Sequence, residues 1–376
     1  MQGTCDMDKS KKVLHYVSIM DRAGEETFIM NVFRSIDRSR VIFDFLVTVN
    51  REGDYDREIR SLGGDVRYFS KIMHGGPIKR ILNLFRLKNY LSPISKEYTT
   101  FHIHTQHAMD AMLDALSAQM AGFKTVVVHS HSTNTLFHLR AHFLCRPILN
   151  KMPIVRLACS DEAGKWLYGD DGKYEIVSNG IITDNFLYDE NARRTIREEE
   201  HWDDRLVIGH VGNFTYPKNH SFILDVFKVF LKNHPDAILA MAGKGNLMDE
   251  AIQKAQSLGI YDNVRFLGSR GDANKLFSTF DALLFPSHYE GLPVTLVEAQ
   301  AADLPCLISD AITTETDISP KLRRMSLNNT AEEWAKVLDE MIGDDNRRNV
   351  KDSIISSGYD IGVTVKRLTE IYRGNR

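Results

Sequence analysis

Short apolar runs alternate with amphipathic stretches along most of this chain, and this alternation limits its fold more than any other feature. In the first half we expect strands at 12–18, 41–48, 65–69, 99–104, 124–129 and 154–159. Apolar residues at helical spacing fill the intervals 25–36, 77–91, 107–121 and 134–144. Alternation of strands and helices predicts a parallel sheet with helices on both faces.

The pattern pauses at 178–204, where SNGIITDNF leads into the charged run NARRTIREEEHWDD, and then restarts. The second series is expected to form strands at 206–212, 237–242, 263–267, 281–285 and 305–308, with helices at 219–233, 247–258, 272–279 and 293–302. A length of 376 residues favours two domains, so we expect an α/β protein of two doubly wound, Rossmann-like units.

We place the first unit at 1–190 and the second at 191–355, and we expect a C-terminal helix within 356–376. Ligands in such folds bind beyond the carboxyl ends of the strands, which predicts a central cleft that both units face. The last amphipathic segment, YDIGVTVKRLTEIY, fits local packing and a return to the first domain equally well.

Composition and charge exclude several classes of protein. A net charge of -3 provides no overall attraction for nucleic acid or anionic lipid. The four cysteines (Cys5, Cys145, Cys159 and Cys306) have no metal-ligand spacing, which favours reduced thiols in a cytoplasmic protein. The polar N-terminus and the short apolar run VLHYVSIM after it fit neither a signal peptide nor a membrane span. We therefore expect a soluble protein that at most lies on a membrane.

The stretch DALLFPSHYEGLPVTLVEAQAADLPCLISD (281–310) carries the most chemical information. An apolar strand ends at Pro286, a polar loop follows, and a helix is expected to open at Pro293, since proline suits the first helical position. Gly291 lets the backbone approach a ligand closely. The free N–H groups and positive dipole end of a helix start form an anion site, and a diphosphate is the natural occupant.

Two carboxylates bracket this helix start. Glu290 lies in the loop, and Glu298 lies inside the helix, roughly 7–8 Å further along its axis than Pro293. Carboxylates accept paired hydrogen bonds from vicinal hydroxyls, so the two could hold sugar hydroxyls on either side of the phosphates. The spacing alone, however, favours a solvated loop charge and an ordinary surface residue of a helix.

The segment PSHYEGLPVTLVEAQAADLPCLISD resembles the E-x7-E region of family-4 retaining GT-B glycosyltransferases, especially those of bacterial exopolysaccharide and capsule assembly. The resemblance implies that Glu290 contacts the donor sugar and that Glu298 holds the nucleotide ribose. It also implies that the amides of Gly291 and Leu292 face the distal phosphate. Asp303 stands where the family usually has glycine, a departure that concerns the end of the helix.

The resemblance continues upstream in the same half. HVGNFTYPKNHSFILDVF (210–227) is similar to the segment where the family places a basic pair on the diphosphate. Lys218 matches the lysine of that pair, Asn213 replaces the commoner arginine, and Arg270 is a candidate for the missing charge. MAGKGNL (241–247), with Gly243, resembles the family's glycine-rich turn, and FLGSRGD (266–272) resembles the loop beside the nucleotide base.

In the first half, SIMDRAGEETFIMN (18–31) resembles the family's glycine loop. Gly24 and Glu26 match the Gly-Gly-x-Glu pattern, and Ala23 replaces its other glycine. In TVVVHSHST (125–133), His129 matches the active-site histidine that approaches the donor sugar.

Three further histidines, His102, His104 and His131, also stand at expected strand ends, where histidines are often ordinary surface residues. Together with His129 they make four histidines without an acid at ligand spacing, and we predict no zinc site from them.

The tripeptide Asp54-Tyr55-Asp56 has the DxD form that holds a divalent metal in GT-A enzymes. We interpret it as the capped start of a helix, where acids favour the positive dipole end. The family resemblance implies that no metal and no other cofactor is needed, because a helix N-terminus and basic side chains neutralise the leaving group.

Basic and apolar residues interleave in PIKRILNLFRLKNYL (77–91) and TLFHLRAHFLCRPILNKM (135–152). Such helices can lie on an anionic lipid surface, or they can be plain amphipathic helices whose charges face water. The resemblance implies an acceptor that is a saccharide, including one linked to undecaprenyl diphosphate, and a peripheral contact with the cytoplasmic face of the inner membrane.

The sequence therefore predicts transfer of a sugar from a nucleoside diphosphate sugar to a saccharide acceptor, with retention, in extracellular or capsular polysaccharide assembly. Two alternatives stay open: another GT-B enzyme, such as an epimerase or a phosphorylase, and a non-catalytic sugar- or nucleotide-binding subunit. An NAD-dependent oxidoreductase is disfavoured because the first strand leads into SIMDRAGEE and not into a GxGxxG turn.

Overall fold

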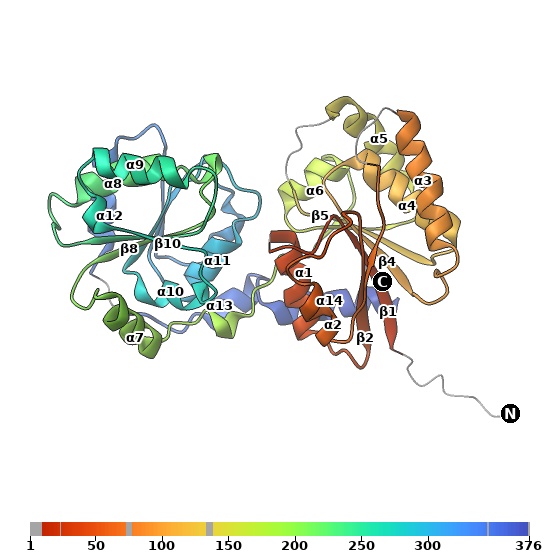
Figure 1. The fold of residues 1–376 in the computed structure, drawn as a ribbon, viewed down its shortest axis with the longest axis horizontal. Helices are drawn as coiled ribbons and strands as arrows, with labels where there is room; N and C mark the ends of the chain where they lie inside the picture. Colours follow the sequence, from red (N-terminus) through yellow and green to blue (C-terminus); the bar gives the residue numbers. More distant parts are fainter. Residues whose placement is uncertain (1–9, 23, 73–76, 133–137, 344–345, 375–376) are drawn as a thin grey trace. The chain divides into compact units, whose positions relative to one another are not determined.

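The computed structural model describes residues 10–22, 24–72, 77–132, 138–343 and 346–374 (Figure 1). Ala23 and Cys5, which the sequence analysis named, lie outside these residues. The chain divides into two compact units, 1–180 with 361–376 and 181–360. The first segment of the first unit thus ends ten residues before the position expected from sequence (180 against 190). A second segment, from residue 361 to the end of the chain, also belongs to this unit.

The sheet of the first unit has the strand order β3-β2-β1-β4-β5-β6-β7, and all its strand pairs are parallel. The strands are β1 (Lys11–Val17), β2 (Val41–Val47), β3 (Val66–Tyr68), β4 (Thr100–Thr105), β5 (Thr125–Ser130), β6 (Val155–Ala158) and β7 (Glu175–Ile176). The six strands expected from apolar runs are confirmed. The two-residue strand β7 carries too short a pattern to be predicted.

Helices cover both faces of this sheet. α1 (Gly24–Ser35) and α14 (Ile361–Arg373) pack against each other on one face, while α3 (Pro77–Leu91), α4 (Ala108–Ala121) and α5 (Leu139–Lys151) lie side by side on the other (Figure 1). Two shorter helices, α2 (Asp56–Ser61) and α6 (Asp161–Tyr168), complete the unit. The face under α3, α4 and α5 is apolar, with residues such as Leu14, Phe101 and Val126 fully or almost fully buried.

The second unit repeats this design with the parallel strand order β10-β9-β8-β11-β12-β13. Its strands are β8 (Val207–Val211), β9 (Ile238–Ala242), β10 (Val264–Gly268), β11 (Ala282–Phe285), β12 (Cys306–Ser309) and β13 (Leu322–Met325). One face packs on α8 (His220–Phe230), α9 (Met248–Ser257) and α12 (Ala331–Met341), and the other packs on α7 (Glu190–Glu200), α10 (Ala273–Thr279) and α11 (Val294–Ala301). The helix α13 (Lys351–Ser356) contacts α11.

The charged run that was expected to be only a polar connection forms α7. Asp189 caps its start by accepting hydrogen bonds from the N–H groups of Asn191 and Ala192. Arg193 and Arg197 then both donate to the carboxylate of Asp281, at 2.6 and 2.7 Å. These ion pairs hold α7 to the sheet in addition to its few apolar side chains. Because few apolar residues are needed, the sequence of α7 shows only a weak apolar pattern.

The aspartates of the DxD tripeptide stand where α2 begins, as predicted, but neither caps the helix. The N-cap position belongs to Tyr55, whose side chain makes no capping bond. Asp56 is buried and accepts a hydrogen bond from the hydroxyl of Tyr68, and Asp54 accepts one from the N–H of Arg22. Within the described residues, no helix is long and apolar enough to cross a membrane.

Candidate active site

Both sheets reverse their strand order beside the first strand of the unit, between β1 and β4 and between β8 and β11. At such a point neighbouring connections leave in opposite directions, so a crevice opens at the carboxyl ends of the strands. In the second unit, the segments that follow β8 and β11 are the two that the sequence analysis assigned to a donor diphosphate.

The structure brings Lys218 and Glu290 together, although 72 residues separate them. Lys218 ends the short 3-10 helix η2 (Tyr216–Lys218), and its Nζ lies 2.7 Å from Oε1 of Glu290 and 4.5 Å from the ring centre of Phe285. The two side chains are only 17% and 12% exposed. A hydrogen bond of 2.8 Å from the N–H of His288 to the carbonyl of Pro217 fixes the two loops to each other.

Glu298, the second carboxylate of the motif, lies on α11 and is partly buried. Burial raises the pKa of its carboxyl to about 7, and the positive charge of Lys218 acts in the opposite direction. One lysine therefore influences both glutamates. The site combines a single cation with two carboxyl groups, one of which ionises near neutral pH.

The helix α11 begins at Val294, so Pro293 occupies the N-cap position and the expectation that it is the first helical residue is wrong by one position. The N–H groups of Gly291 and Leu292 donate to no acceptor among the described residues. A Cβ atom placed on Gly291 would meet no atom within 4 Å. Packing within the protein does not require glycine there, and two amides remain available to an anion.

The turn after β9 is fixed by backbone contacts. Gly243 has φ +149°, and a Cβ atom on it would lie 2.0 Å from the carbonyl oxygen of Gly212. Hydrogen bonds from Gly243 to Gly268 (2.8 Å) and from Gly212 to Ala242 (2.9 Å) join the turns after β8, β9 and β10. Asn213, which follows β8, is exposed at this edge.

Arg270 is already engaged by two acids. Its guanidinium donates to Asp272 at 2.7 and 2.8 Å and to Glu200 at 3.0 Å, and these hydrogen bonds raise the pKa of the arginine. Arg270 could neutralise a diphosphate only by giving up these partners, and its role as a substitute cation stays a prediction.

Asp303, in place of the usual glycine, adopts the left-handed conformation with φ +49° just after α11. Its carboxylate is fully buried, lies 3.0 Å from Nζ of Lys321 and accepts the N–H of Arg348 at 2.9 Å. Aspartate tolerates this conformation better than most residues, and the two contacts offset its strain. The departure from the family pattern is thus accommodated where α11 ends.

In the first unit, Gly24 opens α1, and a Cβ atom on it would also meet nothing within 4 Å. His129 lies near the end of β5 and is fully buried. The expectation that His102 and His104 are surface residues is wrong, since both are buried, and His131 is partly buried. These central strands are covered by α1 and α14, which sequence periodicity could not show.

Comparisons with known proteins bear on this geometry. The family described as glycosyl transferases group 1 matches residues 192–354, the region that holds Lys218, Glu290 and Glu298. The putative glycosyltransferase EpsF of Bacillus subtilis is 34% identical over 380 residues, which cover 96% of each chain. This chain belongs to the group 1 glycosyltransferases.

Other relatives of this glycosyltransferase agree with the assignment. The capsular polysaccharide biosynthesis glycosyltransferase CapH of Staphylococcus aureus is 25% identical, with coverage of 96% of this chain and 98% of CapH. The crystal structure of Anabaena HepE in complex with UDP superimposes with a TM-score of 0.79 at 16% identity, over 96% of this chain and 100% of HepE. That likeness shows the two-unit GT-B fold, as predicted.

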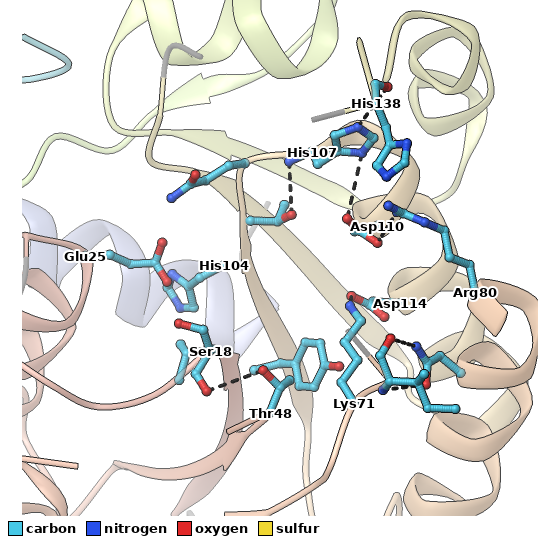
Figure 2. Close-up of a pocket in the computed structure, with 16 residues that line it drawn as sticks. Ser18, Glu25, Thr48, Lys71, Arg80, His104, His107, Asp110, Asp114 and His138 are labelled. Carbon is cyan, nitrogen blue, oxygen red and sulfur yellow. Dashed lines mark hydrogen bonds and ion pairs between the residues drawn. The ribbon is translucent and has the colours of Figure 1, made fainter. Parts of the chain in front are cut away.

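The glycosyltransferase also has a cavity of about 600 Å³ in its first unit, at the carboxyl ends of β1 and β4 (Figure 2). Two ion pairs line it, Lys71 with Asp114 at 2.9 Å and Arg80 with Asp110 at 2.9 Å. Sequence reasoning missed all four residues. The available signal was Asp110 and Asp114 at positions i and i+4 in an alanine-rich helix, since acids on a buried helical face need partners.

Proposed function

We propose that this glycosyltransferase moves a sugar from a nucleoside diphosphate sugar to a saccharide acceptor, with retention, in extracellular or capsular polysaccharide assembly. The contact between Lys218 and Glu290 carries the proposal, because it places a cation beside the free amides of Gly291 and Leu292 at the strand-order reversal. HepE, whose structures contain UDP and UDP-glucose, gives an example of such a donor on this fold.

The chemical contribution of these residues is stabilisation of the leaving group. As the bond between the anomeric carbon and the diphosphate oxygen breaks, Lys218 and the start of α11 receive the developing negative charge. Glu290 accepts hydrogen bonds from the donor sugar, and Glu298 accepts them from the ribose. Neutralisation by a lysine and backbone amides makes a metal unnecessary for transfer.

Retention follows if the acceptor hydroxyl attacks on the face from which the phosphate departs. The departing phosphate oxygen then takes the proton of the hydroxyl, and no covalent sugar–enzyme intermediate forms. This route fits a donor site in which both glutamates are assigned to hydroxyl groups. The role of His129 as the active-site histidine remains a prediction from the family resemblance.

The donor proposal is tested with the purified chain and a panel of labelled nucleoside diphosphate sugars. We expect transfer by the native protein, and a fall of at least about 100-fold in kcat/KM for Lys218→Met and for Glu290→Gln. Lys232→Met, which removes an exposed lysine just after α8, is the matched control and should behave as the native protein does. Near-normal turnover by either site variant would refute the assignment.

The product distinguishes the remaining alternatives. Proton NMR of the new glycosidic bond reports whether the anomeric configuration of the donor is kept, and inversion contradicts the retaining route. Conversion of the donor sugar without an acceptor indicates an epimerase. Binding of a donor without any turnover, in the presence of varied saccharide acceptors, indicates a non-catalytic subunit.

We further propose that the acceptor is linked to a lipid and that the first unit docks on an anionic membrane. Apolar side chains are exposed along α3 (Ile81, Leu82 and Phe85) and α5 (Leu139, Phe143, Leu144 and Ile148), and Leu144 is 74% exposed. Exposed Arg140 and Lys151 flank the α5 row. An apolar stripe with basic neighbours suits a lipid surface. A relative in Escherichia coli, 25% identical over 247 residues, is named for a diphosphoundecaprenol-linked acceptor.

Vesicle sedimentation tests the docking surface. The native chain should sediment with vesicles that contain anionic lipid and much less with neutral ones, because charge and apolar burial act together. The double variant Leu144→Glu and Phe143→Glu should stay in the supernatant, whereas Ile355→Glu, an exposed apolar residue of the second unit, should not change sedimentation. Equal sedimentation of all three chains contradicts the proposal.

A further inference from the structure

Five histidines lie on one face of the three central strands of the first unit. Parallel register places His15 of β1 opposite His102 of β4, and His104 of β4 opposite His129 of β5. His131 directly follows β5, and the contact of its ring with that of His129 places it on the same face. The opposite face holds an apolar core, and therefore the imidazoles are segregated.

These rings contact one another. His15 and His104 are joined by a hydrogen bond of 2.9 Å between ring nitrogens, and so are His104 and His131. Ring centres are 4.2 Å apart for His129 and His131, and 5.8 Å apart for His104 and His129. Burial lowers the pKa of all these imidazoles, that of His131 to about 3. Neutral imidazole is the form that ligates metals.

The hydrogen bonds leave several ring nitrogens unsatisfied. Neither nitrogen of His129 makes a hydrogen bond of ordinary geometry, and the same holds for Nδ1 of His131. A buried polar atom without a hydrogen-bond partner destabilises the fold, because it has lost its hydrogen bonds to water. In a cluster of lone-pair donors, a bound cation is the partner that satisfies several of them at once.

Two sets of three histidines offer ring nitrogens that all lie within 4.8 Å of one another: His15 with His102 and His104, and His104 with His129 and His131. Exposure separates the two sets. Every residue of the first set is buried, whereas the second contains His131, which is partly exposed; His104, which is common to both sets, borders the cavity of the first unit. Glu25 borders the same cavity, where burial raises the pKa of its carboxyl to about 8, so this acid would become ionised as a cation binds nearby (Figure 2).

We propose that His104, His129 and His131 bind one divalent transition metal, for which Zn²⁺ is the natural probe. Three imidazoles with one position left for water or another oxygen form a familiar zinc environment, and the cavity supplies the path of entry. The proposal departs from our expectation from sequence that there is no zinc site. The spacing of the histidines in the sequence did not show that a cavity borders His104 or that Glu25 lines the same cavity. The proposal does not depend on Lys218, Glu290 or Glu298, which lie in the other unit, and it gives His129 a metal as its partner in place of the donor sugar that the family resemblance implies.

The test uses the full chain without a polyhistidine tag, stripped with a chelator and then given Zn²⁺. We expect about one bound metal per chain after gel filtration, by mass spectrometry of the metal. Replacement with Co²⁺ should give the visible absorption of a four-coordinate site. Affinity is measured by competition with a chromophoric chelator, with no donor present, so failure here is distinct from failure of the proposed transfer.

Variants decide between the two sets. His131→Gln and His104→Gln should each weaken Zn²⁺ binding by at least about 100-fold. His15→Gln should leave the affinity within a few-fold of native, and so should His201→Ala, which removes an exposed histidine of the second unit. Circular dichroism checks each fold, and because His131 is partly exposed, its variant is expected to fold even if the His104 variant does not.

Three results would overturn the proposal. The first is less than a tenth of an equivalent of bound metal in the native chain. The second is native affinity in the His131 variant. The third is loss of binding in the His15 variant together with retention in the His131 variant, which would assign the metal to the enclosed set.

Discussion

Glu298 should make the second unit less stable as its carboxyl ionises. Burial raises its pKa to about 7, against 4.5 for an unperturbed glutamate. Below pH 4.5 both the folded and the unfolded chain hold the proton, so this shift has no effect on stability. Between 4.5 and 7 the unfolded chain releases the proton and the folded chain keeps it, and the free energy of unfolding falls. Above pH 7 the loss is complete.

Each unit of pKa shift corresponds to about 1.4 kcal/mol, so the full effect is about 3 kcal/mol. Glutamine does not titrate, so the Glu298→Gln variant avoids this loss. The difference in free energy of unfolding between the variant and the native protein should therefore be about 2 kcal/mol larger, in favour of the variant, at pH 8 than at pH 5.5. For a unit of this size, 181–360, that gain corresponds to about 4–8 °C in Tm.

The assay is calorimetric or fluorimetric unfolding of the donor-free protein at both pH values. Glu340→Gln, on an exposed position of α12, is the control and should show no such pH-dependent gain. If Glu298 holds the ribose as we propose, the same substitution should raise the donor KM, because an amide accepts hydrogen bonds through one oxygen where the carboxylate offers two. A stability difference for Glu298→Gln that is equal at pH 5.5 and pH 8 refutes the reasoning.

Three further substitutions test the packing. Asp281→Asn weakens the contacts with Arg193 and Arg197, and it should lower the free energy of unfolding, measured in urea, by about 3 kcal/mol. Gly243→Ala should cost about 2 kcal/mol or more and weaken nucleotide binding in a thermal-shift titration, because its Cβ atom would collide with a neighbouring carbonyl oxygen. Tyr372→Phe should lower the free energy of unfolding by about 1–3 kcal/mol, since the Tyr372 hydroxyl makes a hydrogen bond of 2.7 Å with a buried ring nitrogen of His102. For each of the three variants, a loss below about 0.5 kcal/mol contradicts the reasoning given for it.

Most strands could be predicted from the sequence because they are buried on both faces, and their sequences are therefore nearly continuous apolar runs. β13, with the sequence LRRM, was missed because it lies at an edge of the sheet and carries two arginines. α5 was expected to end at 144, yet it continues through Pro147 to Lys151. A helix can accept proline where packing compensates, and a local pattern does not show that packing.

The candidate site shows the same division. The motif gave the positions of Glu290, Glu298 and Lys218, since each stands at a strand end or a helix start that sequence can locate. The contact between Lys218 and Glu290 depends on the strand order, which places β8 beside β11. Arg270 seemed a free cation in sequence because an acid two residues along the chain, Asp272, need not face it, and because its other partner, Glu200, is 70 residues away. Nothing in the sequence grouped His15 with the other histidines, because only the register of β1 and β4 places it opposite His102.

The first unit is assembled from two separated pieces of chain, and this has a consequence for biosynthesis. A ribosome releases all of the second unit, as one continuous segment, before α14 emerges to contact α1 and β1. Until then the histidine-bearing side of the first sheet lacks Tyr372 and the rest of its last cover. A nascent or truncated chain that stops before residue 361 should therefore hold a complete second unit and an unfinished first unit, which chaperones and proteases can recognise.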